Sequence, residues 1–249
     1  MKKLMIAASA ALCATVGLSL ESANIVGYQT KAVQAGQSFQ GCAFDQIGVD
    51  GSVLDIQKLV PVDENGDVVG GGDVNIQFYN SFGKFLYSYS YYEKDGWEED
   101  CPAGWYNEDL GELAEYAFNP AEGFKVYTGS EANFLYSGEV NMAETDLPVR
   151  EGQSFQVNAR PCGVNIQSII PVDENEDIVG GGDVNIQFYN SFGKFLYSYS
   201  YYEEDGWEEN CPAGWYDEEL GELAEYSFGA SEGFKVYSGS ACFLRFPEM

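Results

Sequence analysis

Two copies of one acidic, aromatic loop hold the side chains of this sequence that are best suited to contact a ligand. The loops are DGWEEDCPAGWY at 95–106 and DGWEENCPAGWY at 205–216. A sugar ring can stack its C–H face on a tryptophan or tyrosine while neighbouring carboxylates accept hydrogen bonds from its hydroxyl groups. The candidate ligand-binding residues are Asp95, Trp97, Trp105, Tyr106, Asp205, Trp207, Trp215 and Tyr216. The structural alternative is that the tryptophans fold back and close the end of a β-sandwich, since large aromatic side chains are usually buried.

A second pair of segments places oxygen ligands at the spacing that begins a calcium-binding loop. DENGD at 63–67 and DENED at 173–177 keep the Asp-x-Asn-x-Asp pattern, with candidate metal ligands Asp63, Asn65, Asp67, Asp173, Asn175 and Asp177. The rest of an EF-hand is absent. Val68 or Ile178 stands where that loop needs glycine, and Val74 or Val184 stands where it needs glutamate. Two alternatives therefore stay open, a weak calcium site and a solvated turn.

The cysteines predict a repeated set of disulfides. Cys101 and Cys211 occupy equivalent positions in the two aromatic loops, and Cys42 and Cys162 both lie shortly after a GQSFQ segment. Since cysteines of exported proteins are mostly paired and duplicated domains should repeat their cross-links, we expect the disulfides Cys42–Cys101 and Cys162–Cys211. Cys242 has no counterpart, so we expect it to be a buried free thiol or an intermolecular link.

Composition excludes several classes of function. The chain has no histidine, which removes Ser-His-Asp and Cys-His catalysis as well as histidine-ligated zinc. A glycosidase needs only two carboxylates and no histidine. With 40 acidic residues some pair of carboxylates is inevitable, so such a pair is no evidence for catalysis. We therefore predict that the protein is not an enzyme. The formal net charge of −28 repels nucleic acids and anionic lipid surfaces, and it suits an extracellular protein or one that binds cations.

Residues 1–23 predict a secretory signal peptide. Lys2 and Lys3 form a basic start, residues 4–20 are apolar and rich in small side chains, and LSLESAN supplies small residues for cleavage. We expect no membrane span in the mature chain, because no later segment is long and apolar enough. The expected location is secreted, periplasmic or on the cell surface.

The elements that must position these loops are duplicated. Residues 61–130 align with 171–240 without gaps, and 59 of the 70 positions are identical. VGGGDVNIQFYNSFGKFLYSYSYYE occurs at 69–93 and again, unchanged, at 179–203. The chain is therefore a tandem duplication, with copy 1 at 24–138 and copy 2 at 139–249, each close to the usual size of a domain.

Within a copy the hydrophobic period is two, which is typical of β-strands. Residues 74–79 and 85–91 alternate on either side of the turn NSFG and predict a long antiparallel hairpin with aromatic cross-strand pairs. LAEYAF at 113–118 and FKVY at 124–127 predict a second hairpin. SVLDIQKLV at 52–60 allows a short helix, capped by Ser52 and stopped by Pro61. We expect a mainly β protein of two tandem antiparallel β-sandwich or small-barrel domains, each with at most one short helix.

Several short motifs follow one another along the chain: SANIVGYQTK after the signal peptide, a GQSF strand, a GW loop and a closing AEGFKVY strand. This order resembles a group of uncharacterised secreted β-rich repeat domains of Gram-negative bacteria. The resemblance implies an exported β-domain and no activity.

The sequence thus predicts a non-catalytic surface, matrix or binding module without a cofactor, unless calcium binds. Its expected partners are cell-surface or matrix components and not nucleic acids. The alternative is a carbohydrate-binding protein whose paired aromatic loops gain avidity on a polysaccharide.

Overall fold

The computed structural model describes residues 26–41, 54–80, 82–118, 121–190, 194–206, 208–230 and 232–249. The predicted signal peptide, Ser52, Cys42 and Trp207 lie outside these ranges. Within them the regular structure consists of antiparallel strands and two single turns of 3₁₀ helix. The predicted mainly β fold is confirmed.

Copy 1 forms two main sheets. The first has the order β1 (Val26–Val33), β11 (Ala132–Glu139), β4 (Pro61–Val62). The second has the order β2 (Gly36–Gly41), β10 (Gly123–Thr128), β5 (Val74–Tyr79), β6 (Phe85–Tyr92), β7 (Gly104–Asn107), β8 (Glu112–Leu113). A short pair, β3 (Leu54–Asp55) with β9 (Ala117–Phe118), completes the copy.

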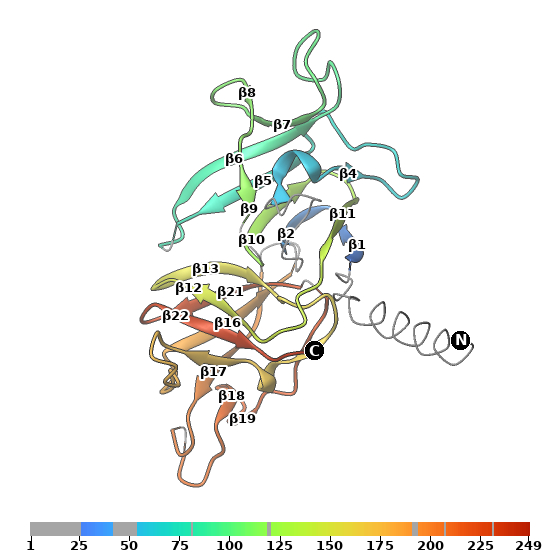
Figure 1. Cartoon of the computed structure of the whole chain (residues 1–249). Coiled ribbons are helices and arrows are strands. Elements are labelled where there is room, and N and C mark those ends of the chain that lie inside the picture. The colour runs from blue at the N-terminus through green and yellow to red at the C-terminus, as the bar shows by residue number, and fades with distance from the viewer. Residues whose placement is uncertain are drawn as a thin grey trace, which may run out of the picture.

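Copy 2 repeats this topology strand for strand. Its smaller sheet has the order β12 (Thr145–Val149), β22 (Cys242–Phe246), β15 (Ile170–Val172). Its larger sheet has the order β13 (Gly152–Val157), β21 (Gly233–Ser238), β16 (Val184–Tyr189), β17 (Phe195–Tyr202), β18 (Gly214–Asp217), β19 (Glu222–Leu223). The short pair is β14 (Val164–Asn165) with β20 (Ser227–Phe228). Figure 1 shows copy 1 in blue to green above copy 2 in yellow to red.

Strand alternation determines what each large sheet buries. Val74 and Ile76 are fully buried and Phe78 nearly so, whereas the residues between them face the other side of β5. On β10, Phe124 and Val126 also point into the core. Because side chains alternate along a strand, the intervening residues of β5 and β10 share the outer face of the sheet. Copy 2 has its own core, built from the equivalent residues.

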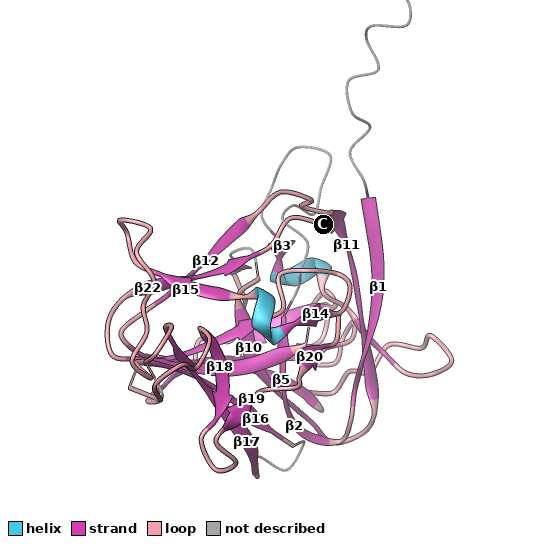
Figure 2. Ribbon diagram, turned by 90° about the horizontal axis from the view of Figure 1, so that it is seen from below, coloured by secondary structure: helices cyan, strands magenta, loops and turns pink. Residues whose placement is uncertain are grey.

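The predicted hairpin β5–β6 is present, but the predicted second hairpin is wrong. β9 pairs with β3, and β10 lies between β2 and β5 in the centre of the large sheet. Phe118 on β9 and Phe124 on β10 instead meet inside the core, with ring centroids 4.9 Å apart. The predicted helix is a single 3₁₀ turn, η1 (Ile56–Lys58), capped by Asp55; Figure 2 shows it and the equivalent η2 (Ile166–Ser168) in cyan.

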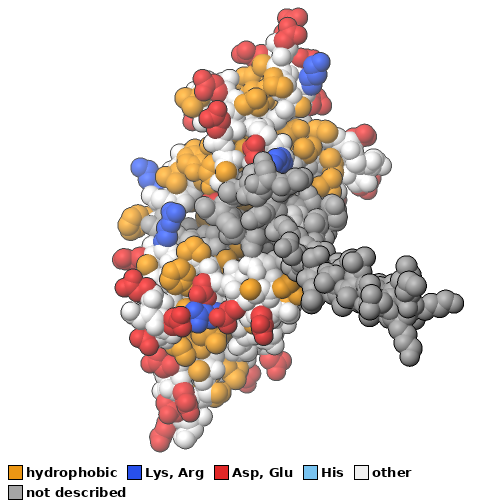
Figure 3. Space-filling view, viewed as in Figure 1, with side chains coloured by type: hydrophobic (Ala, Val, Ile, Leu, Met, Phe, Trp, Pro, Cys, Tyr) orange, Lys and Arg blue, Asp and Glu red, His pale blue; other side chains and the backbone are white. Residues whose placement is uncertain are grey.

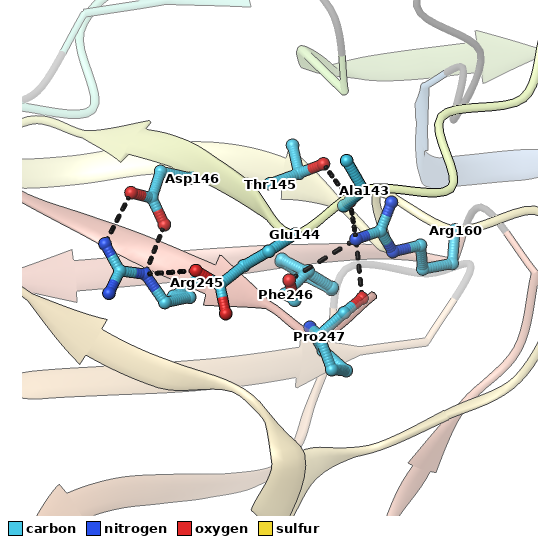
Figure 4. Close-up of polar contacts among 8 residues, drawn as sticks. All are labelled: Ala143, Glu144, Thr145, Asp146, Arg160, Arg245, Phe246 and Pro247. Atoms are coloured by element: carbon cyan, nitrogen blue, oxygen red, sulfur yellow. Dashed lines mark hydrogen bonds and ion pairs between the residues drawn. The ribbon is translucent and has the colours of Figure 1, made fainter. Parts of the chain in front are cut away.

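A fully buried arginine fastens the C-terminal segment of copy 2 to the segment that joins the copies. The guanidinium of Arg160 donates to the carbonyl oxygens of Asn141 (2.7 Å), Ala143 (2.6 Å) and Pro247 (2.6 Å). Nearby, Arg245 on β22 makes two parallel hydrogen bonds of 2.8 Å to the carboxylate of Asp146 (Figure 4). Both contacts hold residues 141–146 against the end of the chain.

The copies meet through β2 and β13, which are the edge strands of the two large sheets. Glycines make the close approach possible: a Cβ on Gly123 would lie 2.6 Å from the carbonyl carbon of Phe155, and a Cβ on Gly233 would collide with the backbone of Phe39. Ala121 of copy 1 is buried among core residues of copy 2. The junction is therefore packed, and the contacts across it are reciprocal.

Candidate functional site

The structure places the predicted aromatic ligand residues mostly in the core. Trp105 and Trp215 have no exposed surface, and their indole N–H groups donate to the carbonyls of Leu59 (2.6 Å) and Ile169 (2.8 Å). Tyr106 and Tyr216 are also buried. These four side chains are buried, as the structural alternative for the aromatic loops predicted. A buried ring offers no face to a sugar.

The rest of each aromatic loop is occupied by contacts within the loop and the sheet beneath it. Trp97 is half-buried, stacks on Tyr106 at 5.9 Å and meets the edge of Tyr92 at 5.0 Å between ring centroids. Tyr92 in turn donates a hydrogen bond to Glu108, and burial together with that carboxylate raises its pKa to about 12. Asp95 and Asp205 are exposed, and both take a positive φ of 59°. In the described part of copy 1 these rings contact one another and do not form an open platform; Trp207 of the second loop lies outside the described residues.

The Asp-x-Asn-x-Asp segments form tight turns. One carboxylate oxygen of Asp63 accepts the backbone N–H groups of Asn65 (2.8 Å) and Asp67 (2.9 Å), and these bonds lower its pKa. Asp173, Asn175 and Asp177 repeat this arrangement in copy 2.

The turn of copy 1 also borders a cavity. Asp63, Glu64, Asp73 and Glu131 line it, and its volume is about 670 Å³. Over the described ranges, no three acidic or cysteine side chains are grouped as they are in a metal site. Calcium binding here therefore stays a prediction.

The predicted disulfide Cys162–Cys211 is wrong, because both residues are free thiols. Cys162 follows β13 and Cys211 precedes β18, and β21, β16 and β17 lie between these strands in the sheet. Three strands therefore separate the elements that the two cysteines flank, whereas a disulfide needs Cα atoms within about 7 Å. The Cys162 sulfur instead lies 3.4 Å from that of Met249.

The other cysteines are free thiols too where they are described. Cys101 is unpaired, and Cys42, its predicted partner, lies outside the described residues. Cys242 is a buried free thiol, which is one of the two states that the sequence predicted for it. Burial raises the pKa of this thiol.

The strongest candidate site lies between the copies, where sequence patterns predicted none. We call it the inter-copy pocket; its volume is about 230 Å³. Its described lining takes the same four residue types from both copies: Gln37 and Gln153, Phe39 and Phe155, Tyr79 and Tyr189, and Lys125 and Lys235. Gly83 also lines it. Phe39 meets Tyr189 edge-on and Phe155 meets Tyr79 edge-on, each at 5.7 Å between centroids. These reciprocal contacts relate the two halves by an approximate twofold axis.

Each lysine of the inter-copy pocket is held by aromatic faces. The ammonium of Lys125 lies 5.2 Å from the ring centroid of Tyr79 and 5.1 Å from that of Tyr127. Lys235 lies 5.3 Å and 4.7 Å from the centroids of Tyr189 and Tyr237. Cation–π attraction of this kind fixes an ammonium without neutralising its charge. Among the described residues, neither of these two lysines forms an ion pair, whereas Arg245 does.

The glutamines present donors to the inter-copy pocket. Their carbonyl oxygens already accept hydrogen bonds, from the Tyr127 hydroxyl to Gln37 at 2.5 Å and from the Tyr237 hydroxyl to Gln153 at 2.8 Å. Their NH₂ groups make no hydrogen bond to any described residue. The described walls thus offer two ammonium and two amide donors beside aromatic rings, and no carboxylate is among the described lining residues. That is unusual for this surface, because carboxylates cover both halves of the face in Figure 3 and basic side chains are few.

Comparison with family models, curated proteins and solved structures finds no match for this chain. No helix in the described part of the chain is long and apolar enough to cross a membrane. The function therefore has to be argued from the pocket itself.

One sequence signal could have pointed to this site. In GFKVY, Phe124 and Val126 alternate with Lys125 and Tyr127, so a basic and an aromatic residue share the outer face of a central strand. The same pattern recurs in copy 2. The pattern does not show that the outer faces of the two copies meet at one pocket.

Proposed function

We propose that this protein is an exported, non-catalytic binding module that holds its ligand in the inter-copy pocket. One observation carries the proposal: residues 116 or 110 positions apart converge as matched pairs around a single cavity. Polar side chains with unused donors, placed beside aromatic rings in a concave site, are typical of ligand-binding pockets. A purely structural junction would be expected to pair or exclude such groups.

The arrangement favours binding over catalysis. The pocket supplies lysine, glutamine, tyrosine and phenylalanine, and it lacks a carboxylate or histidine that could act as a general base at neutral pH. Its aromatic rings form an apolar lining against which the C–H groups of a sugar can pack, so we place the carbohydrate-binding hypothesis at this pocket rather than at the aromatic loops.

The test is a set of binding curves against soluble and insoluble polysaccharides, both neutral and acidic. The variant Gln37→Met/Gln153→Met removes both pocket amides while keeping side-chain length, and Gln34→Met is the matched control on the exposed surface. We expect at least one polysaccharide to bind the wild type and the Gln34 variant and to bind the double variant more weakly. Equal binding to all three proteins, or no binding to any of them, would contradict the proposal.

Weak calcium binding is a second candidate function for copy 1. The observation that favours it is the cavity at the Asp63 turn, in which four carboxylates face a common space. Oxygen-rich, negatively charged surroundings of this kind suit Ca²⁺ at extracellular concentrations.

A further inference from the structure

We infer that the ligand of the inter-copy pocket is a carboxylated sugar polymer, a polyuronate, whose chain runs across the junction between the copies. This inference rests on the proposed function and names its ligand class. It begins from charge. The chain has 40 acidic and 12 basic residues, yet the part of the pocket lining that the structure describes contains two lysines and no carboxylate.

The lysines are arranged to receive an anion. In a protein this acidic, a surface lysine has many carboxylates to pair with, but Lys125 and Lys235 lie between tyrosine rings and keep their charge unpaired within the described structure. Long-range repulsion by the net negative charge is screened within about 8 Å at physiological salt. Within the inter-copy pocket, the two ammonium groups are the charged groups of the described lining that an anionic ligand would contact.

The hydrogen-bonding groups point to the same chemistry. The free amide groups of Gln37 and Gln153 are donors, and the acceptor oxygens of both side chains are already used by tyrosines. A ligand that fits must therefore be rich in acceptors. A carboxylate supplies two acceptor oxygens, and the ether and hydroxyl oxygens of a sugar supply more.

The aromatic rings distinguish a sugar acid from other anions. The faces of Phe39 and Phe155 stack on each other, so these two rings and those of Tyr79 and Tyr189 give the pocket an apolar lining rather than a free stacking face. A sulfate, a phosphate or an extended acidic peptide would leave this apolar lining unused. The apolar C–H face of a uronate ring can pack on it while the carboxylate reaches an ammonium.

The surroundings of the inter-copy pocket favour a polymer. A volume of about 230 Å³ is smaller than the roughly 300–1,000 Å³ of pockets for drug-sized ligands, so the cavity itself holds only a short piece of a chain. The β5–β6 tip, which contributes Gly83, carries the exposed Phe82 and Phe85, and Phe195 is exposed at the equivalent tip of copy 2. These exposed rings lie at the hairpin tips of both halves, where a longer chain could make further contacts.

The experiment compares four probes on the wild-type protein by calorimetry: a polyuronate, its methyl ester, a neutral polysaccharide and polyglutamate. We expect the polyuronate alone to bind well, because the ester lacks the charge and polyglutamate lacks the ring. Lys125→Gln and Lys235→Gln should each weaken polyuronate binding by roughly tenfold and by similar factors, since each removes one charge-assisted contact from equivalent positions. Lys94→Gln, which removes one positive charge from a loop outside the pocket, should bind as the wild type does.

The possible results separate the two proposals. If the methyl ester or the neutral polysaccharide binds as well as the polyuronate and the pocket variants weaken it, the proposed function stands and the uronate class is wrong. If polyglutamate binds equally, the sugar is irrelevant and the inference also fails. If no probe binds, or if the two lysine variants behave as Lys94→Gln does, the inter-copy pocket is not the polyuronate site and the inference is overturned.

Discussion

Phe39 and Phe155 stack face to face across the junction of the two copies, with ring centroids 4.8 Å apart and ring planes inclined by 23°. They are equivalent residues of β2 and β13, so each copy contributes the same side chain to one contact. The pair forms the floor of the inter-copy pocket and joins it to the packing that holds the copies together. Stability of the junction and binding in the pocket should therefore be linked.

Adding a methyl group at the junction should separate the copies. In Gly123→Ala the new Cβ would clash with the backbone of Phe155, so we expect a loss of about 1–3 kcal/mol in the free energy of unfolding and weaker ligand binding. Gly129→Ala is the control, because its Cβ would have no neighbour closer than 3.8 Å. Chemical denaturation measures both. An unchanged stability of Gly123→Ala would show that the close approach of β10 and β13 is not maintained in solution.

Each copy expressed alone, as residues 24–138 or 139–249, should fold cooperatively, since each owns a core cluster. Separation exposes Phe39 or Phe155 and removes Ala121 from the core of copy 2, so we expect both halves to be less stable than the full chain. Thermal unfolding and NMR dispersion report the outcome. A half that shows no cooperative transition would mean that the copies form one domain.

Replacing Arg160 with methionine should destabilise copy 2 by about 2–4 kcal/mol, because the carbonyl oxygens that the buried guanidinium contacts lose a charged donor. Arg245→Met removes the exposed pair with Asp146 and should cost under about 1 kcal/mol. Urea unfolding of the two variants gives the comparison. Similar losses in both would argue against the Arg160 clamp.

Alkaline pH should weaken the fold through Tyr92 and Tyr202, whose pKa values burial and a neighbouring glutamate raise to about 12. Because these values lie above the ordinary tyrosine pKa of about 10, both hydroxyls stabilise the fold fully below pH 10 and lose that effect as pH rises through 12. The variant Tyr92→Phe/Tyr202→Phe should therefore lose less stability than the wild type between about pH 10 and 12. If the stability of the two proteins fell equally between pH 10 and 12, ionisation of Tyr92 and Tyr202 would not be the cause of the loss.

Calcium at about 1 mM should raise the melting temperature if the Asp63 turn binds it, since a ligand of the native state stabilises by mass action. Magnesium at matched ionic strength controls for screening of carboxylates. Asp73→Asn should reduce the calcium effect, and Glu112→Gln, outside the cavity, should preserve it. Equal shifts with both cations would rule out a specific site.

Local patterns predicted local structure well. The alternation through Val74, Ile76 and Phe78 predicted the β5–β6 hairpin, and the weighed alternative for Trp105 and Trp215 described their burial. The second hairpin was wrong because β10 takes its partners from residues far away in the chain, which period-two alternation does not specify. The disulfide Cys162–Cys211 was wrong for a related reason: repeated spacing gives equivalent positions but no strand order. The pocket depends on how two finished sheets pack, so no single segment of sequence contains it.

The glycines at the junction have one more consequence. An edge strand carries unpaired backbone groups that can recruit a strand from another molecule. Gly123 brings β10 of copy 1 against the backbone of β13, and Gly233 brings β21 of copy 2 against that of β2, so each repeat packs against one edge strand of the other. A chain that contains the same sheet twice is at particular risk of polymerising through its edges. In this fold the duplication that creates the risk also supplies the cap against it.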